Sequence, residues 1–147
     1  MLVKYTPQGQ ETQQFEWRPG RVKLKEAAQI EFRYSKESGE KGRTYEQFKQ
    51  DVRVGSAVAR RVLLHHLLRR VHPAIRFEDV DPFDDEVVVV FHRDELEELR
   101  AGMEKDTSMS AEEKANLLER LDQEIDEAPE YGQPGKADAT STTDPDQ

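Results

Sequence analysis

One short acidic segment carries the residue types that most often bind metal ions. Five carboxylates fall within residues 79–86, namely Asp79, Asp81, Asp84, Asp85 and Glu86. A calcium-binding EF-hand loop needs a glycine at its sixth position and a bidentate glutamate at its twelfth, but counting from Asp79 these positions hold Asp84 and Val90. A nuclease site would need a basic side chain beside the carboxylates, and His92 is the one candidate. The segment therefore favours a solvated acidic turn, and a metal-dependent hydrolase that uses residues 79–86 and His92 is the alternative.

The histidines are the other possible metal ligands. The chain has four of them: His65, His66, His72 and His92. His65 and His72 are seven residues apart, so they share a face if one helix runs through both. A helical zinc site needs ligands at i and i+4, and the residue four places after His65 is Arg69. We therefore expect no metal site here and no cofactor.

Other catalytic patterns are missing from the sequence. The chain has no cysteine, which excludes disulfides, iron-sulfur clusters, thiolate zinc sites and a cysteine nucleophile. Gly39, Gly42 and Gly55 are too widely spaced for a phosphate-binding loop, and no serine, histidine and acid follow one another in a hydrolase order. We expect a protein that is not an enzyme.

Formal charge is distributed unevenly along the 147 residues. Residues 1–75 contain 15 Lys and Arg against 8 Asp and Glu, a net charge of +7, whereas residues 76–147 contain 7 against 23, a net charge of −16. Such halves can attract each other within one molecule or between copies, or offer an acidic surface to a basic partner. The acidic half would repel phosphates, so nucleic-acid binding is disfavoured.

Membrane and export signals are not evident in the sequence. No stretch approaches the ~20 apolar residues that a membrane-spanning helix needs. Residues 1–20 include Lys4, Glu11 and Glu16, where a signal peptide would be apolar. We expect a soluble, cytosolic protein with no membrane contact.

Residues 1–71 contain signals for a hairpin followed by helices. Residues 2–5 and 14–17 are rich in strand formers and flank a turn-like segment, which predicts an N-terminal β-arm over residues 1–20. Apolar residues at helical spacing predict a helix over 23–34, and Thr44 can cap a second, short one. The segment 55–71 predicts a central helix, because apolar residues cover more than half of its circumference.

The second half of the chain predicts short extended segments and then two helices. Residues 75–80 suggest a short strand or an extended strap, and the apolar run 87–91 suggests a strand buried on both faces. A helix is expected from residues 93–94 onward, and Ser110 with Glu113 forms a capping box for another. From 130 to 147 the residues are mostly small and polar, which predicts a disordered tail that contributes little to folding.

These signals together predict a mainly α protein. We expect one small helical domain over residues 1–129, with short strands, and a disordered acidic tail over 130–147. Apolar helix faces are the candidate partner-binding sites, since leucine stripes can dock onto partner helices, although packing within the chain's own domain is the commoner use. The candidate residues are Leu63, Leu67, Leu117, Leu118, Leu121 and Ile125.

Residues 15–81 resemble the tail assembly chaperones of long-tailed bacteriophages, especially those that infect actinobacteria. The similarity lies in an aromatic arm at Phe15-Glu16-Trp17, the helix that begins Thr44-Tyr45-Glu46-Gln47-Phe48, and a long helix that finishes Arg69-Arg70-Val71-His72-Pro73. It continues in Ile75-Arg76-Phe77-Glu78-Asp79-Val80-Asp81. The charged loop 35–43 and the valine run that follows the similar region depart from the family pattern.

The resemblance implies a non-enzymatic protein that is made in the host cytoplasm and is absent from the mature virion. Its partners would be the tape-measure protein and the tail-tube protein, and it could also form homo-oligomers. Family members are often made in two lengths by a programmed frameshift, and Pro134-Gly135-Lys136 is the candidate slip site. A metal-dependent phage or host hydrolase and a head-tail adaptor that contacts nucleic acid through the basic half are the alternatives.

Overall fold

The protein is mainly α-helical, with a small sheet, as the sequence predicted. We obtained a computed structural model that describes residues 1–130. These residues group into two compact units, one formed by Val3–Val89 and the other by Met1–Leu2 together with residues 90–130. The sequence had predicted a single helical domain over 1–129. Apart from Glu130, the predicted tail lies outside the described residues.

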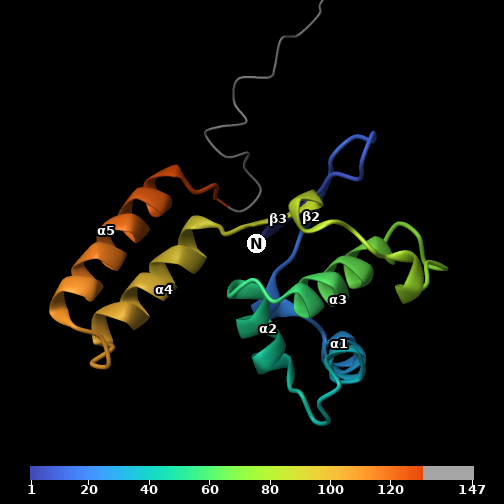
Figure 1. The fold of residues 1–147 in the computed structure, drawn as a ribbon, viewed down its shortest axis with the longest axis horizontal. Helices are drawn as coiled ribbons and strands as arrows, with labels where there is room; N and C mark the ends of the chain where they lie inside the picture. The colour runs from blue at the N-terminus through green and yellow to red at the C-terminus, as the bar shows by residue number, and fades with distance from the viewer. Residues whose placement is uncertain (131–147) are drawn as a thin grey trace, which may run out of the picture. The chain divides into compact units, whose positions relative to one another are not determined.

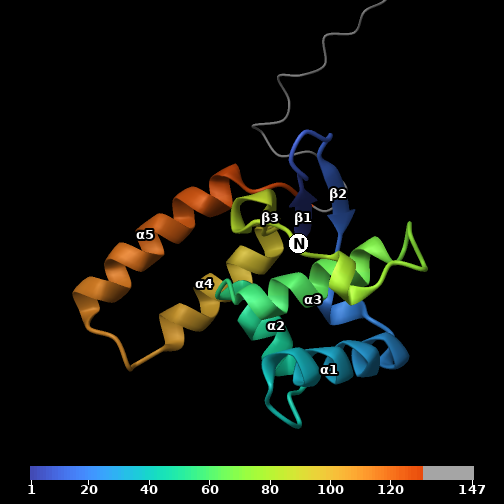
Figure 2. The same ribbon diagram turned by 45° about the vertical axis from the view of Figure 1, so that its right-hand side comes forward.

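Three short strands form the sheet in the order β2-β1-β3 (Figure 2). Strands β1 (Leu2–Tyr5) and β2 (Gln13–Glu16) make the predicted N-terminal hairpin. Strand β3 (Val87–Val90) is an edge strand, and the prediction that its segment is buried on both faces is wrong. Val87 is buried, but the Val88 side chain is 50% exposed, because the alternation of side chains along a strand at this edge turns every second residue to solvent.

The first unit contains three helices: α1 (Leu24–Ser38), α2 (Tyr45–Arg53) and α3 (Ala57–Leu68). Each of the three contacts the other two, and α1 lies alongside α3 (Figures 1 and 2). As predicted, α3 is the most buried helix, with seven buried residues on its twelve positions. This arrangement leaves one long side of α1 without a covering helix among those of its unit.

Helix α1 is longer than the sequence predicted. Instead of ending at residue 34 it continues to Ser38, and Gly39 ends it in the left-handed conformation with φ of 71°. Arg33 and Glu37 form an ion pair of 3.2 Å across this additional turn. Their i, i+4 spacing and the good helix propensity of Lys and Glu explain why a charged segment remains helical up to the glycine.

The segment after α3 also differs from the prediction. The helix ends at Leu68 instead of running to residue 71, because the amides of Val71 and His72 both bond back to the Leu68 carbonyl in a tight turn. Residues 75–80 form no strand, and Phe77–Asp79 is a short 3-10 helix instead. The Arg61 side chain donates to the carbonyl of Val80 at 2.5 Å, so this strap is bonded to α3 through a side chain and not through a sheet.

Phe48 on α2 is the centre of the aromatic core of this unit. Its ring lies 5.9 Å from Trp17, 5.4 Å from Tyr34 and 6.0 Å from Tyr45, measured between ring centroids. The first two pairs are edge-to-face, the geometry that aromatic quadrupoles prefer. Helix α2 therefore joins the residue that follows β2 to α1 through one buried side chain.

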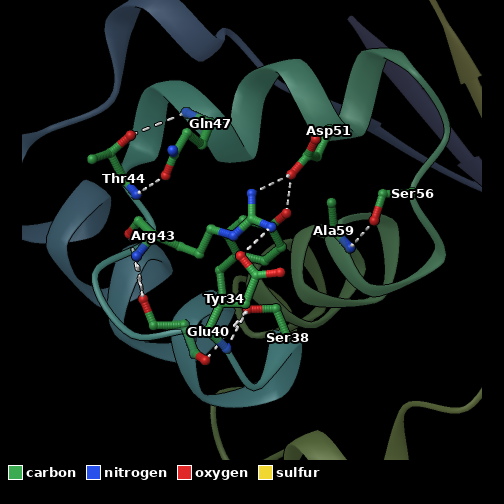
Figure 3. Close-up of polar contacts among 10 residues, drawn as sticks. Tyr34, Ser38, Glu40, Arg43, Thr44, Gln47, Asp51, Ser56 and Ala59 are labelled. Atoms are coloured by element: carbon green, nitrogen blue, oxygen red, sulfur yellow. Dashed lines mark hydrogen bonds and ion pairs between the residues drawn. The ribbon is translucent and has the colours of Figure 1, made fainter.

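The predicted cap of α2 is confirmed. The amide of Gln47 donates to the Thr44 hydroxyl at 3.2 Å, and the amide of Thr44 donates to the Gln47 side-chain oxygen at 2.9 Å (Figure 3). These two bonds satisfy amides that have no partner within the helix. They fix the residue at which α2 begins.

We predict that Thr44→Ala lowers the free energy of unfolding by about 1 kcal/mol, because an orphan amide of α2 then loses its acceptor. Urea denaturation followed by circular dichroism measures this change. Thr44→Ser keeps the oxygen and serves as the control. If the alanine and serine variants unfold at the same urea concentration, the cap does not contribute to stability.

The second unit is built on a helical hairpin of α4 (Arg93–Lys105) and α5 (Ala111–Glu127) (Figure 1). Ser110 and Glu113 form the predicted capping box at the start of α5. Leu96, Leu121 and Ala128 make the buried cluster between the helices, and Phe91, Met103 and Ile125 pack against it. At the surface Arg100 donates to Asp122 at 2.6 Å, which ties α4 to α5.

Candidate partner-binding site

An apolar stripe lies on the exposed side of α1. The Leu24 side chain is 88% exposed and the Phe32 side chain is 73% exposed, and Ala28, which is also exposed, lies between them. Residues at i, i+4 and i+8 lie one above the other on a helix, so the three form a continuous stripe. We call Leu24, Ala28 and Phe32 the α1 face. Large apolar side chains exposed in such a row are typical of protein interaction sites.

A groove runs along one side of Phe32, between α1 and α3. It has a volume of about 470 Å³ and is lined from α1 by Lys25, Phe32 and Arg33 among others. From the α3 side, His66 and Arg69 contribute to its wall. The groove thus combines an apolar edge with basic groups, and no carboxylate among residues 1–130 lines it.

A second hollow lies on the other side of Phe32, toward the loop that leads to α2. Its volume is about 560 Å³, and Ala28 and Phe32 belong to its lining as they do to that of the first groove. Lys36 and Lys41 line it as well. The Phe32 ring is therefore a ridge between two depressions, which is a shape into which the side chains of a second helix can interdigitate.

The cations around the α1 face differ in how far they are already paired. Arg33 bonds to Glu37 and lies 5.0 Å above the ring of Phe77. No ion pair with a residue of the described segment 1–130 engages Lys25 or Arg69, and both are exposed. These two groups are therefore available to a negatively charged partner.

The two histidines of the groove are neutral at neutral pH. Burial lowers the pKa of His65, and its Nε2 lies 3.2 Å from the carbonyl oxygen of Ile75. Burial also lowers the pKa of His66, and the nearby Arg70 lowers it further. The positive charge of the groove at this pH therefore comes from lysine and arginine.

A polar cluster joins α1 and the loop after it to α2 (Figure 3). The Tyr34 hydroxyl donates to Asp51, and Arg43 lies 3.5 Å from the same carboxylate and also pairs with Glu40. Burial and the bond to Asp51 raise the pKa of Tyr34 to about 12, so it stays protonated and remains a donor. Through these contacts Asp51 of α2 is bonded both to α1 and to the loop that follows it.

The structure separates the leucines that the sequence singled out for partner binding. Leu63 and Leu67 are 1% and 0% exposed, so they belong to the core and not to an accessible face. Leu121 is buried in the α4–α5 hairpin, and Ile125 packs against the same cluster. Leu117 and Leu118 are half-buried on α5. In this structure none of the six has the exposure of Leu24 or Phe32.

The possible metal ligands are not gathered into a site. Within residues 1–130 no group of three or more histidines and carboxylates is placed to hold a metal ion. Asp79 bonds to Arg76, which lowers the pKa of its carboxyl group, and Glu86 accepts hydrogen bonds from the amides of Gln8 and Phe83. His92 is fully buried at the start of α4, in the other unit. His72 lies beyond the end of α3, so it does not share a helix face with His65.

The helical spacing that predicted α1 did not distinguish the α1 face from the buried side of the helix. Ile30 and Tyr34 are the buried residues of the helix. Ala28 precedes Ile30 by two positions, and Phe32 precedes Tyr34 by two. Two positions correspond to about 200° around a helix, so these pairs form separate stripes. The second stripe, with lysines beside it, was the available signal.

Within the described part of the chain, no helix is both long and apolar enough to cross a membrane. Comparisons with known proteins give no relative from which a function could be transferred. No protein-family model matches the chain, and neither a curated protein nor a solved structure matches it significantly.

Proposed function

We propose that this protein is a tail assembly chaperone of a long-tailed bacteriophage. It would bind the tape-measure protein and the tail-tube protein in the host cytoplasm during tail assembly, without catalysing a reaction and without entering the mature virion. The resemblance of residues 15–81 to that family motivates the proposal. Binding of this kind requires an accessible apolar surface and enough charge to remain soluble, and it requires no active site.

The observation that carries the proposal is the exposed α1 face. Phe32 and Leu24 would cost free energy in water without a partner to cover them, and the hollows on both sides of Phe32 fit the side chains of a second helix. The lysines and arginines that surround the face would keep it soluble before a partner arrives.

Co-expression tests the proposal. The gene that encodes this chain should lie between a tail-tube gene and a very long gene for a helical tape-measure protein. When the chain and that tape-measure protein are expressed together, we expect them to co-purify and the tape-measure protein to become more soluble. A tape-measure protein that stays insoluble and unbound at every expression ratio would refute the function.

The proposal also predicts a two-length gene product. Pro134-Gly135-Lys136, which lies outside the described residues, can be encoded as CCG GGA AAG. That sequence contains the heptamer G GGA AAG, on which both tRNAs can re-pair one nucleotide back. A segment whose sequence predicts disorder can be exchanged for another without loss of core contacts.

We expect the gene to contain this heptamer and an open −1 frame beyond it, and mass spectrometry of infected cells to detect the longer product. Reading the DNA is the first check. Codons that cannot form the heptamer, or a −1 frame that stops within a few codons, would exclude this site as the slip.

A further inference from the structure

The α1 face has the dimensions of a docking site for one helix. Helix α1 has 15 residues and is therefore about 22 Å long, which corresponds to four turns of a partner. Leu24, Ala28 and Phe32 repeat every four residues along it, and rows with this spacing interdigitate with the equivalent rows of another helix. The hollows beside Phe32 leave room for the partner's side chains on both sides of the ridge.

The charges around the face select the sign of the partner. Lys25 and Arg69 lie along the first groove, and Lys36 and Lys41 along the second hollow. Among the described residues, Glu31 is the single carboxylate that lines either of these two hollows, and it already accepts a hydrogen bond of 2.8 Å from the Tyr45 amide. A helix that carries carboxylates beside its apolar stripe would thus be attracted to both edges, and a basic one would be repelled.

Helix α5 of a second copy of this chain fits the α1 face less well than a helix of another protein does. Residues 90–130 contain 14 Asp and Glu against 5 Lys and Arg, so their charge is suitable. However, Leu121 and Ile125 of α5 already pack against Leu96 within their own unit. The other two leucines of α5, Leu117 and Leu118, are half-buried, so α5 offers carboxylates without an exposed row of large apolar side chains that could cover Phe32.

We infer that the α1 face binds an acidic amphipathic helix of another protein, with apolar residues at i, i+4 and i+8. This inference rests on the proposed function, under which the occupant is an acidic helical segment of the tape-measure protein. It adds the surface that binds, the apolar spacing of the ligand and the sign of its charge. Phe32 is the central apolar contact, and Lys25 and Arg69 lie along one edge of the bound helix.

A pair of designed peptides tests the inference on the full-length protein. Both have 21 residues with leucine at the repeating apolar positions, and they differ only in that one carries glutamates and the other lysines on the flanks. We expect the acidic peptide to bind in fluorescence anisotropy at low salt, at least tenfold more tightly than the basic one. High salt should weaken its binding because the charged contacts are exposed.

Two substitutions connect the binding to the face. Lys25→Glu should lower the affinity for the acidic peptide at least fivefold. The substitution does not disturb the helix, because a carboxylate is favourable in the first turn. Lys105→Glu, which makes the same charge change at the end of α4, is the control and should leave binding unchanged. Phe32→Ser should lower the affinity for the acidic peptide at least tenfold.

Three results of the peptide experiments would overturn the inference. They are binding of neither peptide, equal or tighter binding of the basic one, and equal effects of Lys25→Glu and Lys105→Glu. Oligomers of the protein alone that dissociate with salt and with Phe32→Ser would show that the occupant is a second copy, which also overturns it. If the tape-measure protein still co-purifies in any of these cases, the proposed function stands and only the inferred ligand is wrong.

Discussion

Leu67→Asp is expected to unfold the helical unit that contains α1, α2 and α3. The Leu67 side chain is fully buried on α3, where an ionised carboxylate would be removed from water. A cost of about 4 kcal/mol or more is comparable with the ~5–15 kcal/mol that stabilises a typical domain. Circular dichroism and a solubility assay should show loss of the cooperative thermal transition or an insoluble product.

Leu24→Asp is the matched control for this substitution. It makes the same chemical change at a side chain that is almost fully exposed, in the first turn of α1, where a carboxylate is favourable. We expect its melting temperature to be close to that of the unchanged protein. A soluble Leu67→Asp variant with a normal melting curve would show that Leu67 is accessible, and it would restore Leu67 as a candidate contact for a partner.

Phe32→Glu is expected to abolish co-purification with the tape-measure protein while the melting temperature stays unchanged. The substitution places a carboxylate in the middle of the apolar α1 face, which would have to be desolvated when a helix covers it. Because Phe32 is exposed and Glu is a good helix former, the fold itself loses little. Pull-down from co-expressing cells measures the first effect, and differential scanning fluorimetry measures the second.

Phe83→Glu provides the comparison, since Phe83 is 68% exposed and lies outside α1. It removes a similar exposed ring and adds the same charge, so it should leave co-purification intact. Equal losses for both variants would indicate a general loss of apolar surface or of solubility. Retention of the tape-measure protein by Phe32→Glu would exclude the α1 face as its binding site.

Helix starts could be predicted well because their determinants lie within a few residues. Thr44 and Ser110 each cap a helix and are followed three positions later by an acceptor side chain, and both capping boxes are present in the structure. The N-terminal hairpin could be predicted for the same reason, because its strands and turn lie close together in the sequence. The C-terminal ends of helices were predicted less accurately, because several signals compete there. Helix α1 continues through charged residues until Gly39 ends it. Helix α3 ends at Leu68, although Pro73, the residue expected to stop it, lies five positions later.

Burial could not be predicted with the same accuracy, because it depends on which elements pack together. The valine run at 87–91 has the composition of a strand covered on both sides, but β3 is an edge strand, and Val88 is half exposed. Similarly, the breadth of the apolar surface on α3 identified a central helix without showing that Leu63 and Leu67 are enclosed. The stripe of α1 that stays uncovered carried a signal in the lysines beside it, but its apolar residues alone do not show that no other helix covers them.

The position of Trp17 beside Phe48 makes the two units optically distinguishable. Trp17 is the one tryptophan of the chain, it is fully buried, and it belongs to the unit formed by Val3–Val89. Emission excited at wavelengths selective for indole thus reports only on that unit, while far-ultraviolet circular dichroism also records α4 and α5. Superimposable unfolding curves from the two signals would mean that both units melt as one cooperative system, and separated curves would give each unit a stability of its own.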